Sequence, residues 1–358
     1  MAYTTVDDPS KYFQSNAYTG NGGTRSIVND GNSDMQPDWV WIKKRNDAQN
    51  HTMTDSSRAV ANIIFPDVND AESATQLLTS FNTDGYSLNN NALANGNSQT
   101  YATWQWKANG GTTVTNDASS TSIGSIDSVI QANTDAGFSI ITYTGTGSAA
   151  TVAHGLSAVP HVLIVKKRNA ADNWYVYHHE NTSDPETDYL VLDTTDATAD
   201  DTVFGDAVPS TTTFSINNAG THADGKTFVC YAFTEKQGYS RFGHYIGNAG
   251  EPGGPFIYTG FKPAWIMVKA SSESGQSWVI GDNVRDFNGN LMLRKLFADN
   301  NAAESATAGD NNWDFYSNGF KIKTQDDAMN KNNVTYVYMA FAHRPFVTST
   351  GVPTVGSR

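Results

Sequence analysis

The tripeptide His178-His179-Glu180 contains side chains that bind metal ions and transfer protons in many proteins. Adjacent residues of a strand point to opposite faces, so the two imidazoles cannot share one ion without a bulge, and no framework of Cys and His surrounds them. We therefore expect no metal here. A structural role is the favoured interpretation, and His178 and His179 are kept as candidate binding residues.

An acidic segment follows, with oxygens that could bind calcium at Asp193, Asp196, Asp200 and Asp201. It lacks the ligand spacing and the turn glycine of an EF-hand loop, so a solvated loop is favoured and we predict no cofactor. A glycosidase needs two carboxylates that face each other across a cleft, and the sequence nominates no such pair. The sequence also lacks a G-x-S-x-G elbow, a P-loop and a dinucleotide fingerprint, so we predict that the protein is not an enzyme.

Two Asp and Arg pairs occur with the same spacing, Asp55 with Arg58 and Asp282 with Arg285. An Asp and an Arg three residues apart at a strand exit can form a charge-assisted hydrogen-bonded pair. Because the pair recurs, a structural role is favoured over a catalytic carboxylate.

Tryptophan side chains could stack on sugar rings beside Asn and Asp donors. Trp313 lies in a polar segment, so we predict that Trp313, Asn312 and Asp314 form an exposed contact. The others are interpreted as core residues, because they occupy recurring positions: Trp104, Trp106, Trp174 and Trp278.

Three sets of landmarks recur in the same order and relate these candidates to one another. Each set has a tyrosine and glycine signature, then a proline and an apolar run that ends in lysine, and finally alternating aromatics. The signatures are Tyr18-Thr19-Gly20-Asn21-Gly22, Tyr143-Thr144-Gly145-Thr146-Gly147 and, more loosely, Tyr245-Ile246-Gly247-Asn248; the runs are residues 37–44, 160–167 and 263–269; the closing segments are residues 101–106, 228–233 and 336–341. A period of roughly 100 to 125 residues indicates tandem domains. Aligning Trp174 with Trp278 places His178 opposite Asp282 and Asn181 opposite Arg285.

Short apolar runs bounded by Gly, Asn and Asp predict an all-β fold of three sandwich-like repeats with polar loops and little helix. The expected division is an N-terminal arm plus repeat 1 (1–109), a linker (110–132), repeat 2 (133–240), repeat 3 (241–347) and a C-terminal tail (348–358). Residues 125–133 are the main exception to the strand pattern, because their apolar residues recur at the spacing of an amphipathic helix. The segment that connects repeats 2 and 3 is short, so we expect the two repeats to be docked in a fixed orientation and to form a rigid rod. Both termini are expected to be disordered, with ordering against a neighbouring subunit as the alternative.

The composition of the 358-residue chain narrows the function. A formal net charge of −13 disfavours nucleic-acid binding, and the basic triplets at residues 43–45 and 166–168 are interpreted as solvated strand ends. Cys230 has no partner for an intrachain disulfide and is predicted to be a core residue. No apolar stretch approaches 18 residues, and the first eight residues lack a basic flank, so we expect neither a membrane anchor nor a classical leader.

Several stretches carry a family resemblance: residues 1–9 with Tyr12-Phe13-Gln14, the first signature, Ala136-Gly137-Phe138-Ser139-Ile140 with His154-Gly155-Leu156, and residues 254–263. They resemble a family of virion proteins that is abundant in tailed phages of marine bacteria, and the resemblance covers nearly the whole chain. It implies a particle component with a repeated domain of unassigned function, often likened to concanavalin-A-type lectin sandwiches. That family supplies no catalytic residue set.

We therefore predict a phage virion structural protein on the particle surface, a tail fibre or appendage component that contributes to recognition of host-surface glycans. A capsid decoration or head-fibre protein is the alternative, and a carbohydrate-active depolymerase is a further one. The expected partners are other virion proteins, further copies of this chain in a homo-oligomer and host glycans, with neither nucleic acid nor membrane. The expected localisation is the virion, assembled in the host cytoplasm and released by lysis.

Overall fold

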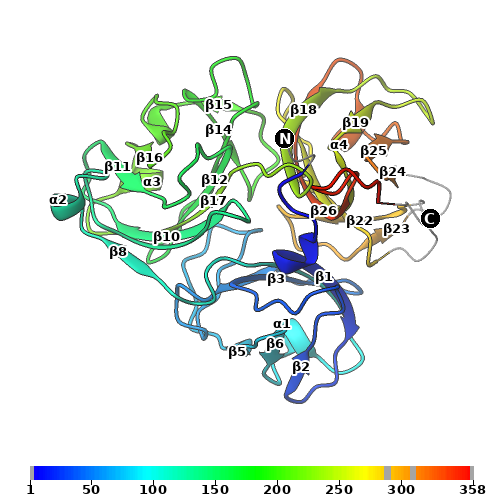
Figure 1. Ribbon diagram of the computed structural model, residues 1–358, viewed down its shortest axis with the longest axis horizontal. Helices are drawn as coiled ribbons and strands as arrows, with labels where there is room; N and C mark the ends of the chain where they lie inside the picture. Colours follow the sequence, from blue (N-terminus) through cyan, green and yellow to red (C-terminus); the bar gives the residue numbers. More distant parts are fainter. Residues whose placement is uncertain (1–3, 286–291, 307–311, 355–358) are drawn as a thin grey trace.

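The computed structural model describes residues 4–285, 292–306 and 312–354, and antiparallel strands dominate it. The strands form three repeats, each with one large and one small sheet (Figure 1). The large sheets face one another around a common centre, and each small sheet covers the outer face of its own large sheet. The prediction of an all-β fold with sandwich-like repeats is confirmed.

Repeat 1 (residues 4–109) has a large sheet of order β1-β7-β3-β4 and a small sheet of order β2-β6-β5. Its elements are η1 (Pro9–Lys11), β1 (Phe13–Thr19), β2 (Arg25–Ile27), β3 (Trp39–Lys44), β4 (Thr52–Asp55), β5 (Leu78–Phe81), β6 (Tyr86–Leu88), α1 (Ala92–Asn95) and β7 (Thr100–Trp106).

Repeat 2 (residues 110–239) contains the same four-stranded unit as β10-β17-β12-β13, extended at both edges, and a small sheet of β11 and β16. Its elements are β8 (Val114–Asn116), α2 (Ala118–Thr121), β9 (Ser128–Asn133), β10 (Phe138–Thr144), β11 (Ala150–Ala153), β12 (Val162–Lys167), β13 (Trp174–His178), β14 (Asp188–Val191), β15 (Ala199–Asp200), η2 (Thr202–Phe204), β16 (Thr213–Ile216), α3 (Ala219–His222) and β17 (Thr227–Phe233).

Repeat 3 (residues 240–347) repeats the unit as β18-β26-β20-β21, with a small sheet of order β19-β25-β24. Its elements are β18 (Ser240–Ile246), β19 (Phe256–Tyr258), β20 (Phe261–Ala270), β21 (Val279–Asp282), β22 (Arg294–Phe297), β23 (Ser305–Ala306), β24 (Trp313–Tyr316), β25 (Gly319–Ile322), α4 (Asp327–Asn330) and β26 (Thr335–Pro345).

Two sequence predictions about the connections are wrong. Residues 110–132, expected as a linker, contain β8 and most of β9, and both strands belong to the large sheet of repeat 2. The helical spacing in 125–133 is also misleading, since β9 pairs along β10 and its β-branched residues suit a strand. The repeats do not form a rod, because the third repeat packs back against the first (Figure 1).

The termini pack on the chain itself within the described residues. Thr5 N–H donates to Gln237 O over 3.2 Å, and Val6 is buried in the central cluster. Ser349 N–H donates to Asp7 Oδ1 over 2.6 Å, which joins the two ends of the chain. For residues 4–7 and 349, the prediction of disordered arms is therefore wrong, because the body of the chain supplies their partners.

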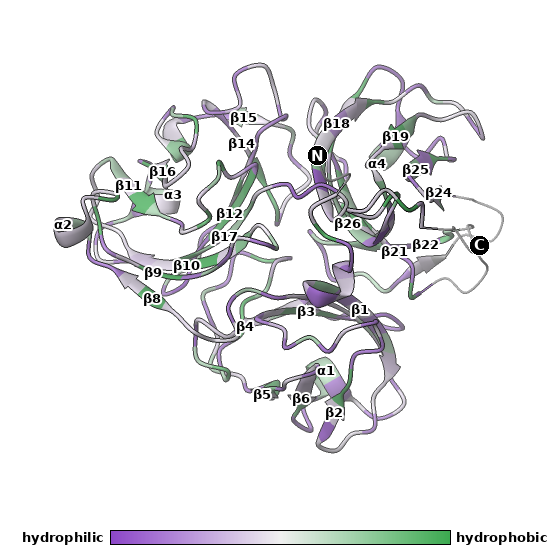
Figure 2. Ribbon diagram, viewed as in Figure 1, coloured by the Kyte–Doolittle hydropathy of each residue, from purple (hydrophilic) through white to green (hydrophobic). Residues whose placement is uncertain are grey.

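The inner strands β3, β12 and β20 are buried on both faces. In β3, Trp39 and Trp41 face the centre, whereas Val40 and Ile42 face the core of repeat 1. The same alternation holds in β12 and β20, because successive side chains of a strand point to opposite sides. Each of these strands therefore contains a run of buried residues with a different core on either side, and hydrophilic residues gather in the loops (Figure 2). Cys230 lies in the core of repeat 2, as predicted.

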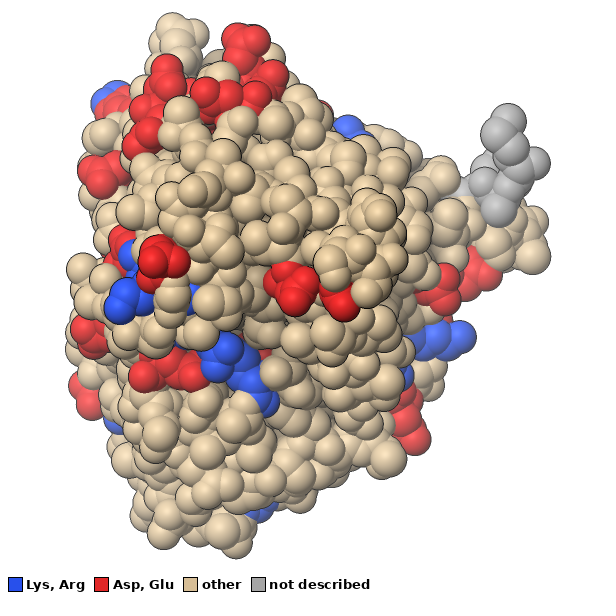
Figure 3. All heavy atoms as spheres, turned by 90° about the vertical axis from the view of Figure 1, so that its left-hand side faces the viewer, with Lys and Arg blue, Asp and Glu red and all other residues tan. Residues whose placement is uncertain are grey.

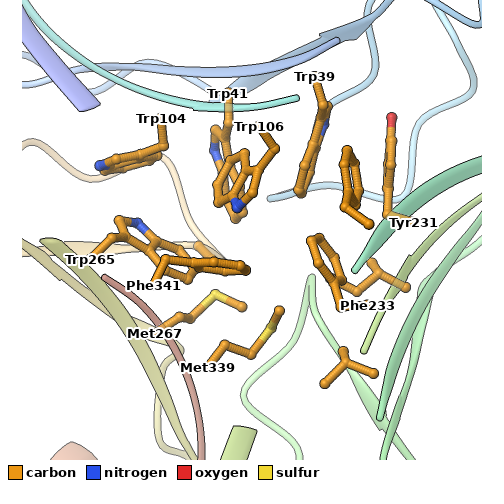
Figure 4. Close-up of a cluster of buried hydrophobic side chains, with 14 of the residues drawn as sticks. Trp39, Trp41, Trp104, Trp106, Tyr231, Phe233, Trp265, Met267, Met339 and Phe341 are labelled. Atoms are coloured by element: carbon orange, nitrogen blue, oxygen red, sulfur yellow. The ribbon is translucent and has the colours of Figure 1, made fainter. Parts of the chain in front are cut away.

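The centre is a cluster of aromatic side chains from all three repeats (Figure 4). Trp39 of repeat 1 stacks on Tyr231 of repeat 2, with ring centroids 4.3 Å apart. Trp106 of repeat 1 meets Trp265 of repeat 3 edge to face at 5.6 Å. Phe233 and Phe341 join repeats 2 and 3 at 5.7 Å. Offset and edge-to-face geometries are the favoured ones for aromatic pairs, so the three large sheets share one core.

The tyrosine and glycine signatures close each repeat onto a one-turn helix. The tyrosine hydroxyls donate to the carbonyls of that helix over 2.7–2.8 Å: Tyr18 to Ala94, Tyr143 to Thr221 and Tyr245 to Met329. A Cβ on Gly20 would lie 2.2 Å from Gly96 O, so only glycine fits, and Gly145 and Gly247 are equally confined. The third signature keeps this Tyr and this Gly but places the exposed Ile246 between them.

A buried lysine in each repeat ties it to its neighbour. Each Nζ donates to a loop carbonyl of the adjacent repeat over 3.0 Å: Lys43 to Asn301, Lys166 to Asn69 and Lys269 to Thr195. Burial lowers the pKa of all three ammonium groups to about 8. The interpretation of residues 43–45 and 166–168 as solvated strand ends is wrong, since these lysines cross interfaces.

Because the three repeats share one core, we predict that they unfold together. Trp106→Ala should lower the free energy of unfolding by about 3–5 kcal/mol, the usual cost of deleting a large buried aromatic side chain. Urea unfolding followed by tryptophan fluorescence and far-ultraviolet circular dichroism should give one coincident transition. The exposed Val208 supplies the control, since Val208→Ala should leave stability nearly unchanged. Separate transitions for the repeats would contradict a shared core.

Candidate functional site

Three interfaces join the repeats, and four equivalent sequence positions meet at each. The first position ends strand β4, β13 or β21, and the second lies three residues later. The third lies further along the same repeat, at residue 72, 198 or 304. The fourth is the residue after β3, β12 or β20 of the adjoining repeat. The backbone N–H of the third position donates to the carbonyl of the fourth over 2.7–2.9 Å at every interface. The residues are Asp55, Arg58, Glu72 and Arg168 at interface 1–2; Asp282, Arg285, Glu304 and Arg45 at interface 3–1; and His178, Asn181, Thr198 and Ser271 at interface 2–3.

Interface 1–2 holds a buried ionic network. Arg58 Nε donates to Asp55 Oδ2 over 2.6 Å, and Arg58 Nη1 donates to Glu72 Oε2 over 2.6 Å. Arg168 of repeat 2 binds both oxygens of Glu72, over 2.9 and 3.0 Å. Tyr231 of repeat 2 donates its hydroxyl to Asp55 over 2.6 Å. The predicted structural pair Asp55 and Arg58 is confirmed, and it extends into the next repeat.

Interface 3–1 has the same network. Arg285 Nε donates to Asp282 Oδ2 over 2.6 Å, and Arg285 Nη1 donates to Glu304 over 3.1 Å. Arg45 of repeat 1 binds Glu304 through two nitrogens, over 2.8 and 2.9 Å. Trp104 of repeat 1 donates its indole N–H to Asp282 over 2.9 Å. The predicted pair Asp282 and Arg285 is therefore confirmed too.

Charge neutralisation outweighs burial in both networks. Burial alone would raise the pKa of Glu304, but the hydrogen bonds from Arg45 and the charge of Arg285 lower that pKa to about 2. Burial would likewise lower the pKa of Arg58, but the carboxylate of Asp55 raises it above the usual value. Glu304 and Arg58 thus keep their charges at neutral pH, and each network holds two repeats together.

Interface 2–3 carries no such network. His178 and Asn181 stand where the other interfaces have Asp and Arg, as the aligned tryptophans predicted. Thr198 replaces the Glu and donates its hydroxyl to Asn181 Oδ1 over 2.7 Å. Ser271 replaces the bridging Arg and donates to Thr335 O over 3.3 Å. Three long charged side chains are thus exchanged for three short neutral ones.

The exchange leaves a groove of about 690 Å³ between repeats 2 and 3. The groove is lined by His179, Glu180, Asn181, Thr182, Ser183, Ala197, Thr198, His244, Ile246, Ser271, Ser272 and Thr335. Most of these side chains are small and polar, and Glu180 carries the sole carboxylate among these described lining residues. The groove therefore offers hydrogen-bond donors and acceptors rather than a strong field.

Asn181 lies in the wall of the groove with an unused donor. Its side chain is 4% exposed, and Nδ2 has no hydrogen-bond partner within the described part of the chain. At the two other interfaces the residue in this place is an arginine with both neighbouring carboxylates in contact. Other buried atoms of the described chain also lack a partner, among them Trp39 Nε1 and Trp265 Nε1, but these lie in apolar cores, whereas Asn181 belongs to the lining of the groove.

The side chains of His178, His179 and Glu180 bind backbone groups of the edge strand β18 and of its neighbour β26. His178 Nε2 contacts Tyr338 O at 3.2 Å, and His179 Nε2 contacts Phe242 O at 2.8 Å. Glu180 accepts the backbone N–H of His244 over 3.1 Å and contacts His244 Nδ1 at 2.9 Å. The favoured structural interpretation agrees with these contacts. Of the two histidines, His179 also lines the groove, while His178 lies beneath it in the interface.

Three other candidate residues lie away from the groove and are buried. Trp313 is fully buried in the core of repeat 3, where its ring lies against Gly281 of β21. Asn312 donates to Leu293 O over 2.8 Å, and Asp314 pairs with Lys323 at 3.1 Å. The prediction of an exposed contact is wrong, because Trp313 begins a strand of the small sheet and its ring points inward. The predicted core positions of Trp104, Trp106, Trp174 and Trp278 are confirmed.

Asp193 of the acidic segment serves the fold. Its Oδ1 accepts the backbone N–H of Trp174 over 2.8 Å, as Asp299 accepts that of Trp278. Asp201 accepts the N–H of Thr202 at the start of η2. Within the described ranges, no group of three His, Cys, Asp or Glu side chains is placed to hold a metal ion.

Sequence reasoning missed the interface role of Arg45, Arg168, Glu72 and Glu304. One sequence feature could have identified the two arginines. Each Asp and Arg pair has a basic triplet in the repeat that adjoins it, and interface 2–3 has neither the pair nor the triplet. The two glutamates lie in loops of different length, so no spacing relates them.

Fold and site together define a ring of three β-sandwich repeats in one chain, with a polar groove at one of its interfaces. The chain belongs to a family described as a domain of unknown function, DUF7483, whose model matches residues 8–345. The family unit thus spans all three repeats. No curated protein matches the chain, and no solved structure does. Each α-helix in the described ranges is a single turn, and none could span a bilayer.

The first prediction about the site concerns the ionic network. Asp55→Asn leaves the buried Arg58 guanidinium short of one carboxylate, so the free energy of unfolding should fall by about 3–5 kcal/mol. The double variant Asp55→His, Arg58→Asn introduces the pair of interface 2–3 and removes the buried cation, so it should lose less. Urea unfolding of both variants is the measurement. A single variant that is as stable as the double variant would contradict this role of the pair.

The second prediction concerns pH. Burial, with a smaller contribution from His179, lowers the pKa of His178 to about 3. Between pH 6.5 and 3 the unfolded chain binds one more proton at this residue than the folded chain, so stability is present above pH 6.5 and is lost as the pH falls. The loss amounts to about 1.4 kcal/mol per pH unit. Urea unfolding at pH 7, 6 and 5 should therefore show a steeper loss for the wild type than for His178→Gln. Parallel curves would rule out this assignment.

Proposed function

We propose that this protein is a structural protein of a phage virion, exposed on the particle surface as part of a tail appendage, and that it recognises host-surface glycans. The observation that carries recognition is the groove at interface 2–3. At two of three equivalent interfaces these positions hold a charged network, and at the third they hold short polar groups that line the groove. A ring with a structural role alone could carry the same ionic network at all three interfaces.

The placement on a virion is supported by the sequence resemblance described above. The surface is consistent with it: acidic side chains gather at the upper end of the face in Figure 3, and the Lys and Arg side chains there are few and close to acidic ones. Such a face repels nucleic acid and keeps the protein soluble at high local concentration. One core shared by three repeats also suits a protein that works outside a cell without disulfide bonds.

Binding is favoured over hydrolysis at this groove. The usual glycosidases use two carboxyl groups on opposite sides of the scissile bond. Glu180 is the one carboxylate among the described lining residues, and it is already bonded to His244. A depolymerase would require a further acid from another molecule.

A capsid decoration or head-fibre protein is the second candidate. The closed ring favours it to the same degree, because three packed repeats form a compact body and not a rod (Figure 1). Location on the particle separates the two candidates.

Immunogold labelling of intact particles tests the placement, and we expect label at the tail. Label confined to the capsid shell would replace the appendage with the decoration role, and particles without label would overturn the virion assignment. Purified host-surface polysaccharide tests the activity: the protein should be retained on it without release of reducing ends. Released reducing ends would establish a depolymerase instead.

A further inference from the structure

Two independent observations at interface 2–3 point to a ligand. The first is the groove of about 690 Å³, which is large enough for a small sugar. The second is the amide of Asn181, which is 4% exposed and whose Nδ2 lacks a partner in the described chain. At interfaces 1–2 and 3–1 the equivalent space contains an arginine held by two carboxylates.

We propose that this groove is a binding site for a neutral saccharide, and that Asn181 Nδ2 donates a hydrogen bond to a sugar oxygen. This inference rests on the proposed recognition function and names its site, its main donor and its ligand class. In this structure Nδ2 is buried within the lining and Oδ1 accepts from Thr198, so the Asn181 amide must turn for Nδ2 to reach a ligand oxygen.

The lining matches the chemistry of a sugar. The hydroxyl of Ser272 accepts the N–H of Thr335 and keeps its own proton for a ligand oxygen. The hydroxyls of Thr182 and Ser183 donate to Asp188 and Asp184, so toward a ligand they act as acceptors. Ile246 lines the groove and is 58% exposed, so it offers an apolar surface for the C–H face of a ring. The same position is a threonine in the two other signatures, Thr19 and Thr144.

The charge of the site favours a neutral ligand. The two arginines and two carboxylates of the other networks are absent here, so neither an anion nor a cation finds a buried counter-charge. Glu180 is bonded to His244 and would repel an acidic sugar. Neutral hydroxyls avoid the desolvation cost that a charged group would meet.

A protein strand fits the site less well. β18 lies at the edge of its sheet and would be the natural place to add a strand. The backbone groups it presents are already occupied by repeat 2: Phe242 O by His179, and His244 N–H by Glu180. Glu235 takes the N–H of Phe242 over 2.7 Å. These three groups of β18 are therefore not open to another backbone, which disfavours an added strand over residues 242–244.

The test is binding of named sugars to the full chain by saturation-transfer nuclear magnetic resonance and calorimetry. The probes are glucose, galactose, mannose and N-acetylglucosamine, with glucuronic acid as the charged comparison and the hexapeptide Thr-Val-Thr-Val-Thr-Val as a strand. We expect at least one neutral sugar to bind. Asn181→Leu should weaken that binding at least tenfold, and Asn217→Leu, the same exchange on an exposed residue of repeat 2, should leave it unchanged.

A second variant fills the groove with the residues found at the other interfaces. It combines His178→Asp, Asn181→Arg, Thr198→Glu and Ser271→Arg, and it should abolish binding while the unfolding transition remains cooperative. Where this variant does not fold, Asn181→Leu carries the test alone.

The outcomes separate the two proposals. Sugar binding that Asn181→Leu leaves unchanged would overturn this site but keep the recognition function. Binding of the hexapeptide or of glucuronic acid alone would overturn the neutral-saccharide assignment. A virion-located protein that binds none of these sugars would overturn this inference and leave the virion placement intact. Absence from the particle would overturn the proposed virion function, whatever the sugars do.

Discussion

Burial of both faces of the large sheets is the constraint on which the structure depends. Each four-stranded unit places one row of side chains in the core of its own repeat and the alternate row in the central aromatic cluster. Trp39 and Val40 show the division within two residues. Because the three sheets share the centre, no repeat can move far without exposing rings such as Trp106 and Phe341. The central cluster thus fixes the distance between the loops that meet at each interface.

Once the centre fixes the geometry, the interfaces are free to differ in chemistry. At interfaces 1–2 and 3–1, buried charges neutralise one another, and removal of any one leaves another unpaired. At interface 2–3, imidazole and carboxylate side chains instead bind backbone groups of β18 and β26. Both arrangements hold two repeats in register. The second needs fewer long side chains, and the space they leave is the groove.

The sequence predicts what recurs and fails where partners lie far apart. Tyr and Gly signatures, the Asp and Arg pairs and the alignment of His178 with Asp282 all follow from local spacing, and the structure agrees. The packing of the three repeats into a ring cannot be predicted from local spacing, because contacts such as that of Arg45 with Glu304 join residues that are far apart in the sequence. The prediction that Trp313 is exposed failed for a related reason. A polar segment precedes Trp313 in the sequence, but its ring packs into a core that other strands form. Residues 110–132 have linker composition, yet they form the edge strand β8 and most of β9 beside it.

The unpaired amide of Asn181 is the energetic consequence of the residues that differ at interface 2–3. A buried donor without a partner costs about 1–3 kcal/mol, whereas an apolar residue of similar shape would avoid that cost. The equivalent arginines, Arg58 and Arg285, have both neighbouring carboxylates in contact. Asn181 Nδ2 has no such contact among the described residues. A sugar oxygen bonded to Nδ2, as we propose, would supply the missing partner, so part of the binding free energy would come from this one amide.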